Sequence, residues 1–457
     1  MRRGFLVSFV VMTVVVGGGP VSAHALPTAT LVKDINPGTA NSTPLRPAKV
    51  GNTLFFTAVD STHGRELWKS DGTAAGTKLV RDINPGGGNS DPYQLTGVGG
   101  RLFFAAYNPV YGSELWKSDG TAAGTTLVRD LNPGSAGTGH LREFTNVGNA
   151  LFFTAFDSTH GSELWKSDGT AAGTQLVADI NPGPSSSIPG FLKNLGGTLF
   201  FSATAQTNNP ELWKSDGTAA GTQLVKEIYP GDTGSFAAPE AAFAGALFFD
   251  AIHPDYGSEL WTSDGTGPGT RLVKDIWPGP RGNGADWLTA VPGKLFFTAF
   301  APAHGTELRR TDGTAVGTKL VKDIRPEESS SYPFFLTNVA GRLLFGADDG
   351  TRGRELWKSD GTAAGTTLIK DINPGRTDTD LSSFTAVGGN LFFSAGQPTR
   401  GFEPWISDGS AAGTKVVRDI NPGRPSSRPN ALTNVGGRLL FAAAEPGHGR
   451  ELWKAVP

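Results

Sequence analysis

Several residue types and patterns are scarce or missing from this 457-residue chain. It contains no cysteine and only two methionines. The absence of cysteine excludes a disulfide framework, a thiol nucleophile and a lipid-attached cysteine at a cleavage site. No second apolar stretch follows the N-terminal one at membrane-spanning length. Stability must therefore come from packing alone.

Charge is also nearly balanced. Without Arg2 and Arg3, 38 of the 40 basic side chains remain against 42 acidic ones, a net formal charge of −4. No run of Lys or Arg stands out, so the basic surface expected of a nucleic-acid-binding protein is missing. The sequence also lacks His-Glu-x-x-His and Gly-x-Ser-x-Gly. These absences predict a protein without nucleic-acid partners and without a familiar catalytic motif.

The first 25 residues have the pattern of a secretory signal peptide. Arg2 and Arg3 precede an apolar stretch over residues 5–16, and small residues surround His24. About 12 apolar residues are too few to cross a bilayer. We therefore expect cleavage after Ala25 and a secreted protein, periplasmic, extracellular or on the cell surface; a retained N-terminal anchor is the alternative. Residues 26–457 then span 432 positions, which equals nine periods of 48.

The abundant feature is a repeat. Glu-Leu-Trp-Lys-Ser-Asp-Gly-Thr at residues 66–73 recurs in close copies, and its Asp-Gly pair is spaced by 48 or 49 residues. The eight Asp-Gly pairs begin at Asp71, Asp119, Asp168, Asp216, Asp264, Asp312, Asp360 and Asp408. A period near 48 is typical of a propeller blade. Glycine (63 residues) and proline (31) are frequent, and no segment keeps a helical period.

Each period predicts four strands. In the first complete copy these are residues 45–50, 54–58, 66–69 and 78–83, joined by Gly-, Asn- and Asp-containing turns. The Leu-Phe-Phe and the Asp-Ile-Asn-Pro-Gly elements both occur nine times, whereas the linking Asp-Gly turn occurs only eight times. The chain thus begins with a lone fourth strand (residues 31–35) and ends with the third (residues 451–454). We predict an all-β, nine-bladed propeller closed by these two ends; an open superhelix is the alternative.

These residues resemble the bacterial ELWxxDGT repeat family over essentially the whole chain after residue 25. The likeness rests on Glu-Leu-Trp-Lys-Ser-Asp-Gly-Thr followed by Gly-Thr and Asp-Ile-Asn-Pro-Gly. It implies a secreted or surface repeat protein with a propeller-like fold. It implies no established activity.

Most repeated residues have structural explanations. Trp68 and its seven equivalents suit burial between neighbouring sheets. Glu66 and its eight equivalents suit pairing with a cation or backbone amide better than a metal ring, because calcium needs several converging oxygens. The Gly-rich loop at residues 72–77 precedes no helix, so a phosphate site is not expected. His63 and its equivalents are loop tips or a recognition surface. No cofactor and no metal are expected.

Variation between copies points to a binding surface. The segments that join the fourth strand of one blade to the first strand of the next vary freely, and rigid scaffolds usually carry binding residues on such loops. One sector departs together: Tyr229, Trp277 and Arg325 replace the repeat Asn, Trp287 lies in a following loop, and Tyr256 takes a His position. Exposed aromatics suit a sugar ring or a protein hot spot. Drift among redundant repeats, indicated by Arg309 at a Trp position, is the alternative.

The sequence therefore predicts a monomeric, non-catalytic scaffold that recognises a glycan or a cell-surface protein through its variable loops. Ligand-binding candidates are Trp277, Trp287, Tyr229, Tyr256 and Arg325. A polysaccharide hydrolase or lyase working in the channel is one alternative. A structural or adhesive envelope component is another.

Overall fold

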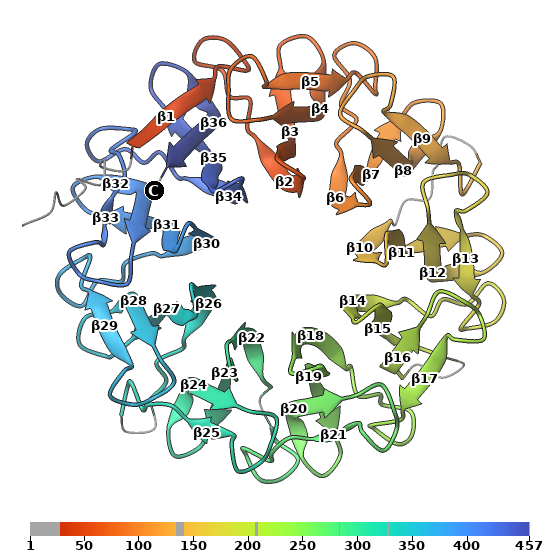
Figure 1. Ribbon diagram of the computed structural model, residues 1–457, viewed down its shortest axis with the longest axis vertical. Coiled ribbons are helices and arrows are strands. Elements are labelled where there is room, and N and C mark those ends of the chain that lie inside the picture. Colours follow the sequence, from red (N-terminus) through yellow and green to blue (C-terminus); the bar gives the residue numbers. More distant parts are fainter. Residues whose placement is uncertain (1–27, 134–140, 206–208, 283, 327–328, 457) are drawn as a thin grey trace, which may run out of the picture.

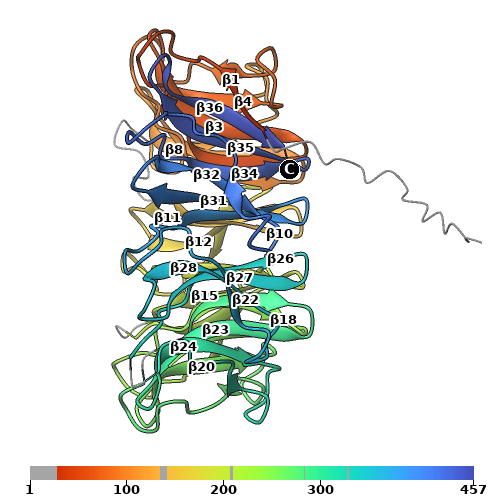
Figure 2. The ribbon, with the colours of Figure 1, turned by 90° about the vertical axis from the view of Figure 1, so that its left-hand side faces the viewer.

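A computed structural model describes residues 28–456 except 134–140, 206–208, 283 and 327–328. Nine four-stranded antiparallel sheets stand around an open central channel. The closed ring is seen face-on in Figure 1 and edge-on in Figure 2. The prediction of a nine-bladed propeller is confirmed, and the open superhelix is wrong. The proposed signal peptide lies outside the described residues.

Each blade contains strands a, b, c and d, counted outward from the channel (Figure 1). Strands a are β2 (Leu45–Val50), β6 (Tyr93–Val98), β10 (Arg142–Val147), β14 (Gly190–Leu195), β18 (Ala238–Phe243), β22 (Asp286–Val291), β26 (Phe334–Val339), β30 (Ser382–Val387) and β34 (Asn430–Val435). Strands b are β3 (Thr53–Asp60), β7 (Arg101–Asn108), β11 (Ala150–Asp157), β15 (Thr198–Ala203), β19 (Ala246–His253), β23 (Lys294–Ala301), β27 (Arg342–Asp348), β31 (Asn390–Gln397) and β35 (Arg438–Glu445).

The outer two strands of each blade follow the same order. Strands c are β4 (Gly64–Ser70), β8 (Gly112–Ser118), β12 (Gly161–Ser167), β16 (Glu211–Ser215), β20 (Gly257–Ser263), β24 (Gly305–Thr311), β28 (Arg354–Ser359), β32 (Gly401–Ser407) and β36 (Gly449–Val456). Strands d are β5 (Lys78–Arg81), β9 (Thr126–Arg129), β13 (Gln175–Ala178), β17 (Gln223–Lys226), β21 (Arg271–Leu272), β25 (Lys319–Leu320), β29 (Thr367–Lys370), β33 (Lys415–Val416) and β1 (Thr28–Lys33). The described residues contain no helix long and apolar enough to cross a membrane.

The core lies between blades. Strand b is buried on both faces, so its consecutive phenylalanines serve two different interfaces. In blade one, Phe55 packs in a cluster shared with blade two, and Phe56 packs in a cluster shared with blade nine. The predicted burial of the repeat tryptophans is confirmed at seven of eight positions, since only Trp213 is half-buried. Each blade thus depends on both neighbours for its core.

Cationic side chains tie neighbouring blades in two ways, each of which recurs at several interfaces of the ring. A Lys or Arg on strand d extends over the Trp of the next blade, as Lys226 does with its Nζ 5.9 Å from the ring centre of Trp261. The same ammonium donates to the Thr270 carbonyl of that blade at 2.8 Å. A Lys on strand c reaches the next Asp-Gly turn: Lys166 Nζ donates to the Gly217 carbonyl at 2.7 Å. Such contacts fix the angle between neighbouring blades.

The chain ends close the ring with these same contacts. β1 pairs with β36 in antiparallel register, Thr28 opposite Val456. Lys454 Nζ donates to the Gly72 carbonyl at 3.1 Å, and Lys33 Nζ to the Thr77 carbonyl at 2.9 Å. Strand β1 covers residues 28–33 rather than the predicted 31–35, because the Ile35 amide bonds to the Glu451 carboxylate instead of continuing the ladder.

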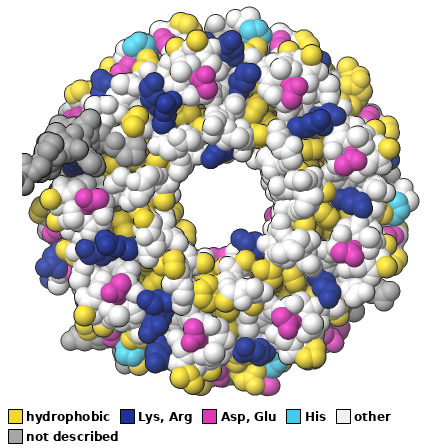
Figure 3. All heavy atoms as spheres, in the orientation of Figure 1, with side chains coloured by type: hydrophobic (Ala, Val, Ile, Leu, Met, Phe, Trp, Pro, Cys, Tyr) yellow, Lys and Arg dark blue, Asp and Glu magenta, His cyan; other side chains and the backbone are white. Residues whose placement is uncertain are grey.

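The Asp-Gly turns are self-contained. In the first, Asp71 Oδ1 accepts from the Thr73 amide at 2.8 Å and from its hydroxyl at 2.7 Å, and Thr73 Oγ1 accepts from the Gly76 amide at 2.9 Å. A side chain at Gly76 would begin 2.1 Å from the Asp71 carboxylate, so only glycine fits. The geometry of the turn therefore explains why this motif is nearly constant from repeat to repeat. These turns lie on the face shown in Figure 3, where acidic and basic side chains are spread around the open channel.

Removing the closing strand tests the ring. A protein that begins at residue 39 loses Val32 and Ile35 from the core and leaves the edge of β36 unpaired. Burial of a side chain of this size contributes about 1.5–3 kcal/mol. We expect the midpoint of thermal unfolding to fall by at least about 5 °C relative to a protein that begins at residue 26. Equal midpoints by circular dichroism would contradict closure through β1.

Arg309 offers a second stability test. It is 7% exposed at the position of the repeat Trp, and burial lowers its pKa although Glu259 and Glu307 raise it. Arg309→Trp removes a buried cation and restores a ring beneath Lys274, so the free energy of unfolding should rise by about 1–3 kcal/mol. Trp357→Arg, the reciprocal change one blade later, should lower it. Urea unfolding measures both, and a destabilised Arg309→Trp protein would refute the argument.

Candidate functional site

The d-to-a connections and the b-to-c loops lie together on the face opposite the Asp-Gly turns, here called the loop face. A buried glutamate at the start of strand c holds each connection in place. Glu66 accepts hydrogen bonds from the amides of Ile83 (3.0 Å) and Ser90 (3.0 Å), and from the Ser90 hydroxyl (2.6 Å). Glu66 therefore pairs with backbone amides, one of the predicted kinds of partner, and also with a serine hydroxyl.

The glutamate contact recurs around the ring. Glu163, Glu211, Glu307, Glu403 and Glu451 hold an Ile amide and a Ser in the same way. In blade seven the hydroxyl of Thr379 replaces that of the serine. Burial raises the pKa of Glu66 to about 7, against the lowering effect of these hydrogen bonds. The variable connections are therefore anchored on a constant support.

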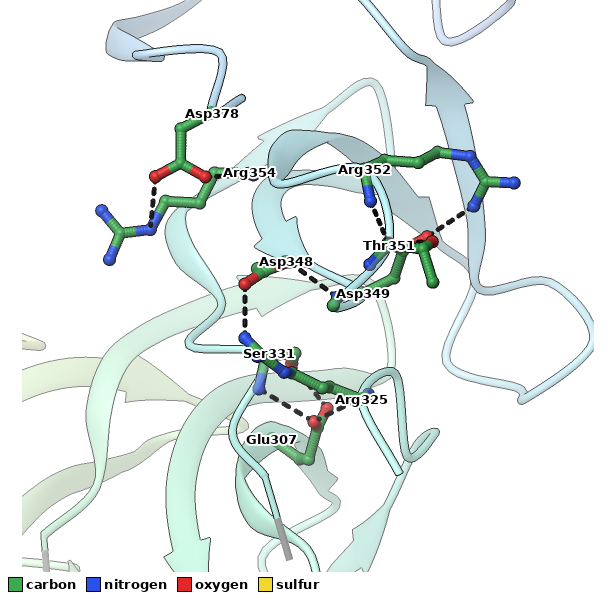
Figure 4. Close-up of polar contacts among 10 residues, drawn as sticks. Glu307, Arg325, Ser331, Asp348, Asp349, Thr351, Arg352, Arg354 and Asp378 are labelled. Atoms are coloured by element: carbon green, nitrogen blue, oxygen red, sulfur yellow. Dashed lines mark hydrogen bonds and ion pairs between the residues drawn. The ribbon is translucent and has the colours of Figure 1, made fainter. Parts of the chain in front are cut away.

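The candidate residues at the former Asn position contact the next blade. The amides of Tyr229, Trp277 and Arg325 all bond to the glutamate of their own blade. The Trp277 ring packs on Phe300, with centroids 4.8 Å apart, and the Arg325 guanidinium pairs with Asp348. Figure 4 shows Arg325 between Glu307 and Asp348. The side chains of Trp277 and Arg325 are therefore engaged in packing and pairing, and Tyr229 is half-buried.

Tyr256 also sits outside the channel. Its ring stacks on His253 at 4.7 Å, beside the core of blade five. The other loop-tip positions pair with nearby carboxylates: His63 Nδ1 lies 2.8 Å from Asp60, and His160 Nδ1 lies 2.9 Å from Asp157. Among the described residues no group of three or more His, Asp or Glu could hold a metal ion. The histidines are therefore explained as loop-tip supports.

Trp287 lies in a different place, on the channel wall. It occupies the second position of strand β22 and has a φ of +60°. Eight of the nine strands a have a bulge with a positive φ at this position; blade five instead carries Pro239, whose ring fixes φ near −65°. The residues with positive φ are Arg46, Gln94, Glu143, Phe191, Trp287, Phe335, Ser383 and Ala431. Because strand a is innermost, exposed side chains there line the channel (Figure 1).

Large apolar side chains are exposed along one half of this wall. Five such side chains belong to blades four to seven and are 41% to 59% exposed; we call them the apolar arc. They are Ile188, Phe191, Phe236, Trp287 and Tyr332. Phe335 extends the arc, with its ring 5.2 Å from that of Trp287. All six residues have a positive φ, which bulky side chains rarely adopt. Of these residues, only Trp287 was among the binding candidates predicted from the sequence.

The repeats themselves show that the fold does not require this arc. At the position of Trp287, other blades carry Arg46, Gln94 and Ser383; at the position of Tyr332, they carry Thr43 and Asp91. The backbone has the same left-handed conformation at these polar residues. The fold therefore does not require apolar side chains at these positions, although Tyr107, Val110 and Tyr111 form a second exposed apolar set in blade two.

Two cavities of similar volume differ in whether the polar side chains that line them already make hydrogen bonds within the protein. One of about 360 Å³ on the turn face is lined by Lys358 and Asp360, and both already bond within the repeat framework. Another of about 370 Å³ lies between blades eight and nine on the loop face and includes Ser382, Ser394 and Arg428. Among the described residues these three side chains have no hydrogen-bond partner in the protein.

Comparison with known proteins identifies no family for this chain. No protein-family model and no curated protein matches the chain. Solved structures that are similar include a puromycin hydrolase mutant complexed with PGG (16% identity, TM-score 0.41, 77% of this chain and 58% of that one). The β-propeller domain of the Trilobed protease from Pyrococcus furiosus is similar too (11% identity, TM-score 0.38, 72% and 98%). A gluconolactonase from Xanthomonas campestris has 14% identity and a TM-score of 0.29 (61% and 93%). The chain spans about three-fifths of the puromycin hydrolase.

The glutamates predict how stability depends on pH. Burial raises the pKa of Glu66, Glu163, Glu259, Glu355 and Glu451 to about 7, from 4.5 in an exposed chain. Between these values the folded protein binds more protons than the unfolded one, so stability falls as pH rises from about 4.5 to about 7. Urea midpoints across this window should show the decline. Glu66→Gln, which removes one titrating group, should make it shallower; a flat or rising wild-type profile would contradict the assignment.

Proposed function

We propose that this protein is an exported, non-catalytic scaffold that recognises a glycan or a cell-surface protein through its loop face. The apolar arc carries the proposal. Its aromatic rings are exposed, stand on bulged strands a or on the connections just before them, and occupy positions where other blades have polar or small residues. Exposed rings on a rigid surface suit the apolar face of a sugar ring or a protein hot spot.

Two features of the sequence support the wider setting. Membership of the ELWxxDGT repeat family rests on the copies of residues 66–73, which recur through the chain. Export rests on residues 1–25, whose charged start and short apolar stretch fit a signal peptide. We place the protein outside the cytoplasm, as a monomer that needs no cofactor.

The arrangement of the arc favours one extended ligand. Its residues follow each other over four successive blades, and the Trp287 ring meets the Phe335 ring edge-on. A ligand that crosses the channel mouth can therefore contact several rings at once. Trp277, Tyr229 and Arg325 lie at the start of d-to-a connections, and Tyr256 lies in a b-to-c loop. They are secondary candidates, because packing or pairing already engages Trp277, Tyr256 and Arg325.

Binding to a glycan panel tests the arc. We expect a saturable ligand for the protein beginning at residue 26, and a loss of at least about tenfold in affinity for Trp287→Ala combined with Tyr332→Thr. Both replacements copy residues of other blades, Ala431 and Thr43, so folding should be unaffected. Gln94→Ala and Thr43→Ala on the opposite half serve as controls. A ligand that binds the arc variant with unchanged affinity would contradict the proposal, and a blank panel would redirect it to a protein partner.

A further inference from the structure

The cavity between blades eight and nine is open because three positions carry serine. Ser382 and Ser383 begin strand β30, and Ser394 lies opposite Ser382 on β31. Phe402, Arg428 and Asn430 complete the walls of a space of about 370 Å³, within the size range of small-molecule sites. We call this set the serine pocket. Unlike the apolar arc, it combines serine, asparagine and arginine side chains with the apolar surfaces of Phe402 and Pro429.

The neighbouring blade shows how the same place can be filled. In blade seven, Phe334 stands where blade eight has Ser382, and Gly346 stands where it has Ser394. The Phe334 ring lies over Gly346 so closely that a side chain there would begin 2.3 Å from it. Arg354 lies above the ring, with its guanidinium carbon 6.0 Å from the ring centre. Small side chains in blade eight therefore leave a hollow that the fold can close.

The polar groups of the serine pocket are free to bind. Among the described residues, the hydroxyls of Ser382, Ser383 and Ser394 make no hydrogen bond to the protein, and buried Asn430 Oδ1 has no donor. A buried acceptor without a donor is unfavourable unless something else supplies one. The pocket thus offers several hydrogen-bonding groups of both kinds within one small space.

Arg428 gives the pocket a positive charge. Its backbone is fixed on both sides: its amide donates to the Phe402 carbonyl at 3.1 Å, and its carbonyl accepts from the Arg450 guanidinium at 2.9 Å. Its own guanidinium has no acidic partner among the described residues. Burial and the neighbouring Arg428 charge lower the pKa of Arg450, so the two cations are close to each other. An anionic group is the natural partner for this pair.

We infer that the serine pocket binds a carboxylated sugar residue of an acidic polysaccharide. The carboxylate pairs with Arg428, sugar hydroxyls bond to the serines, and Phe402 faces the apolar side of the ring. Sulfate or a simple carboxylate fits less well, because neither brings hydroxyl groups to the serines. The inference rests on the proposed recognition role of the loop face and adds the chemical class of ligand.

Calorimetric titration with defined trisaccharides tests the inference. Trimers of galacturonic, glucuronic and mannuronic acid are compared with the trimers of galactose, glucose and mannose, and with succinate and sulfate. We expect at least one uronic acid trimer to bind at least about tenfold more tightly than its neutral counterpart and than either simple anion. Failure of all three acidic trimers to bind, or equal affinity for a neutral trimer or for succinate, overturns the inference.

Two variants place the binding in the pocket. Arg428→Ala should weaken uronic acid binding at least about tenfold and remove the preference over the neutral trimer. Ser382→Phe with Ser394→Gly copies the filled arrangement of blade seven and should abolish binding with an unchanged melting temperature. Binding that persists in this filled variant overturns the location.

A variant of the apolar arc separates this inference from the proposed function. Val316→Thr, at an exposed position of the turn face outside both the serine pocket and the apolar arc, should leave the preference for the acidic trimer intact, whereas Trp287→Ala reports any contribution of the arc. Loss of uronic acid binding in the pocket variants alone supports the pocket. Loss in Trp287→Ala alone would assign the sugar to the apolar arc and refute the pocket while keeping the proposed function.

Discussion

A buried glutamate connects each blade to the next, and the loop face depends on it. The carboxylate sits at the start of strand c and gathers the amides and hydroxyl of the following d-to-a connection, as Glu66 does with Ile83 and Ser90. The connection can then vary between its fixed points, because its two ends are held without using the variable side chains. The same contact joins Glu451 to Ile35 and Ser42, so the two ends of the chain are held as firmly as any internal pair of blades.

The two faces of the ring differ in how far their side chains vary from blade to blade. On the turn face, Asp71, Thr73 and Gly76 satisfy each other, and Lys ties run from blade to blade. On the loop face the glutamates supply the support, and the residues above them differ: aromatic on blades four to seven, small and polar at blades eight and nine. A nearly ninefold framework thus presents a surface without ninefold symmetry.

The fold could be predicted from the sequence because local signals repeat. A period of 48, two elements counted nine times and a turn counted eight times determine both the blade number and the closing strand. The strand limits differ by a few residues, as where Asp82 leaves the ladder and its carboxylate accepts the Gly86 amide. The side chain of Trp277 was predicted as exposed, but Phe300 comes from the next blade and covers part of it. Contacts between blades do not show in a comparison of aligned repeats.

The proposed binding surface was harder to predict for a related reason. Aromatic replacements such as Trp287 stand out in a sequence, whereas Ser382 and Ser394 look ordinary. They line the proposed pocket because their small side chains leave space unfilled. The preceding blade shows this, since the Phe334 ring fills the equivalent space there. A comparison of residues that face each other across the sheet would have found the pocket, since Ser382 and Ser394 are paired in β30 and β31.

The pairing of β1 with β36 has a consequence for how the chain folds. The contact between Ile35 and Glu451 spans 416 residues, so the first strand has no partner until the last blade has been synthesised. Blades one to eight can form in order, each on its predecessor, while the outer edge of the ninth sheet stays open. Unpaired edges promote association with other chains. The slow and vulnerable step of folding is therefore the meeting of the two ends, and conditions that keep the chain dilute until then favour the intact ring.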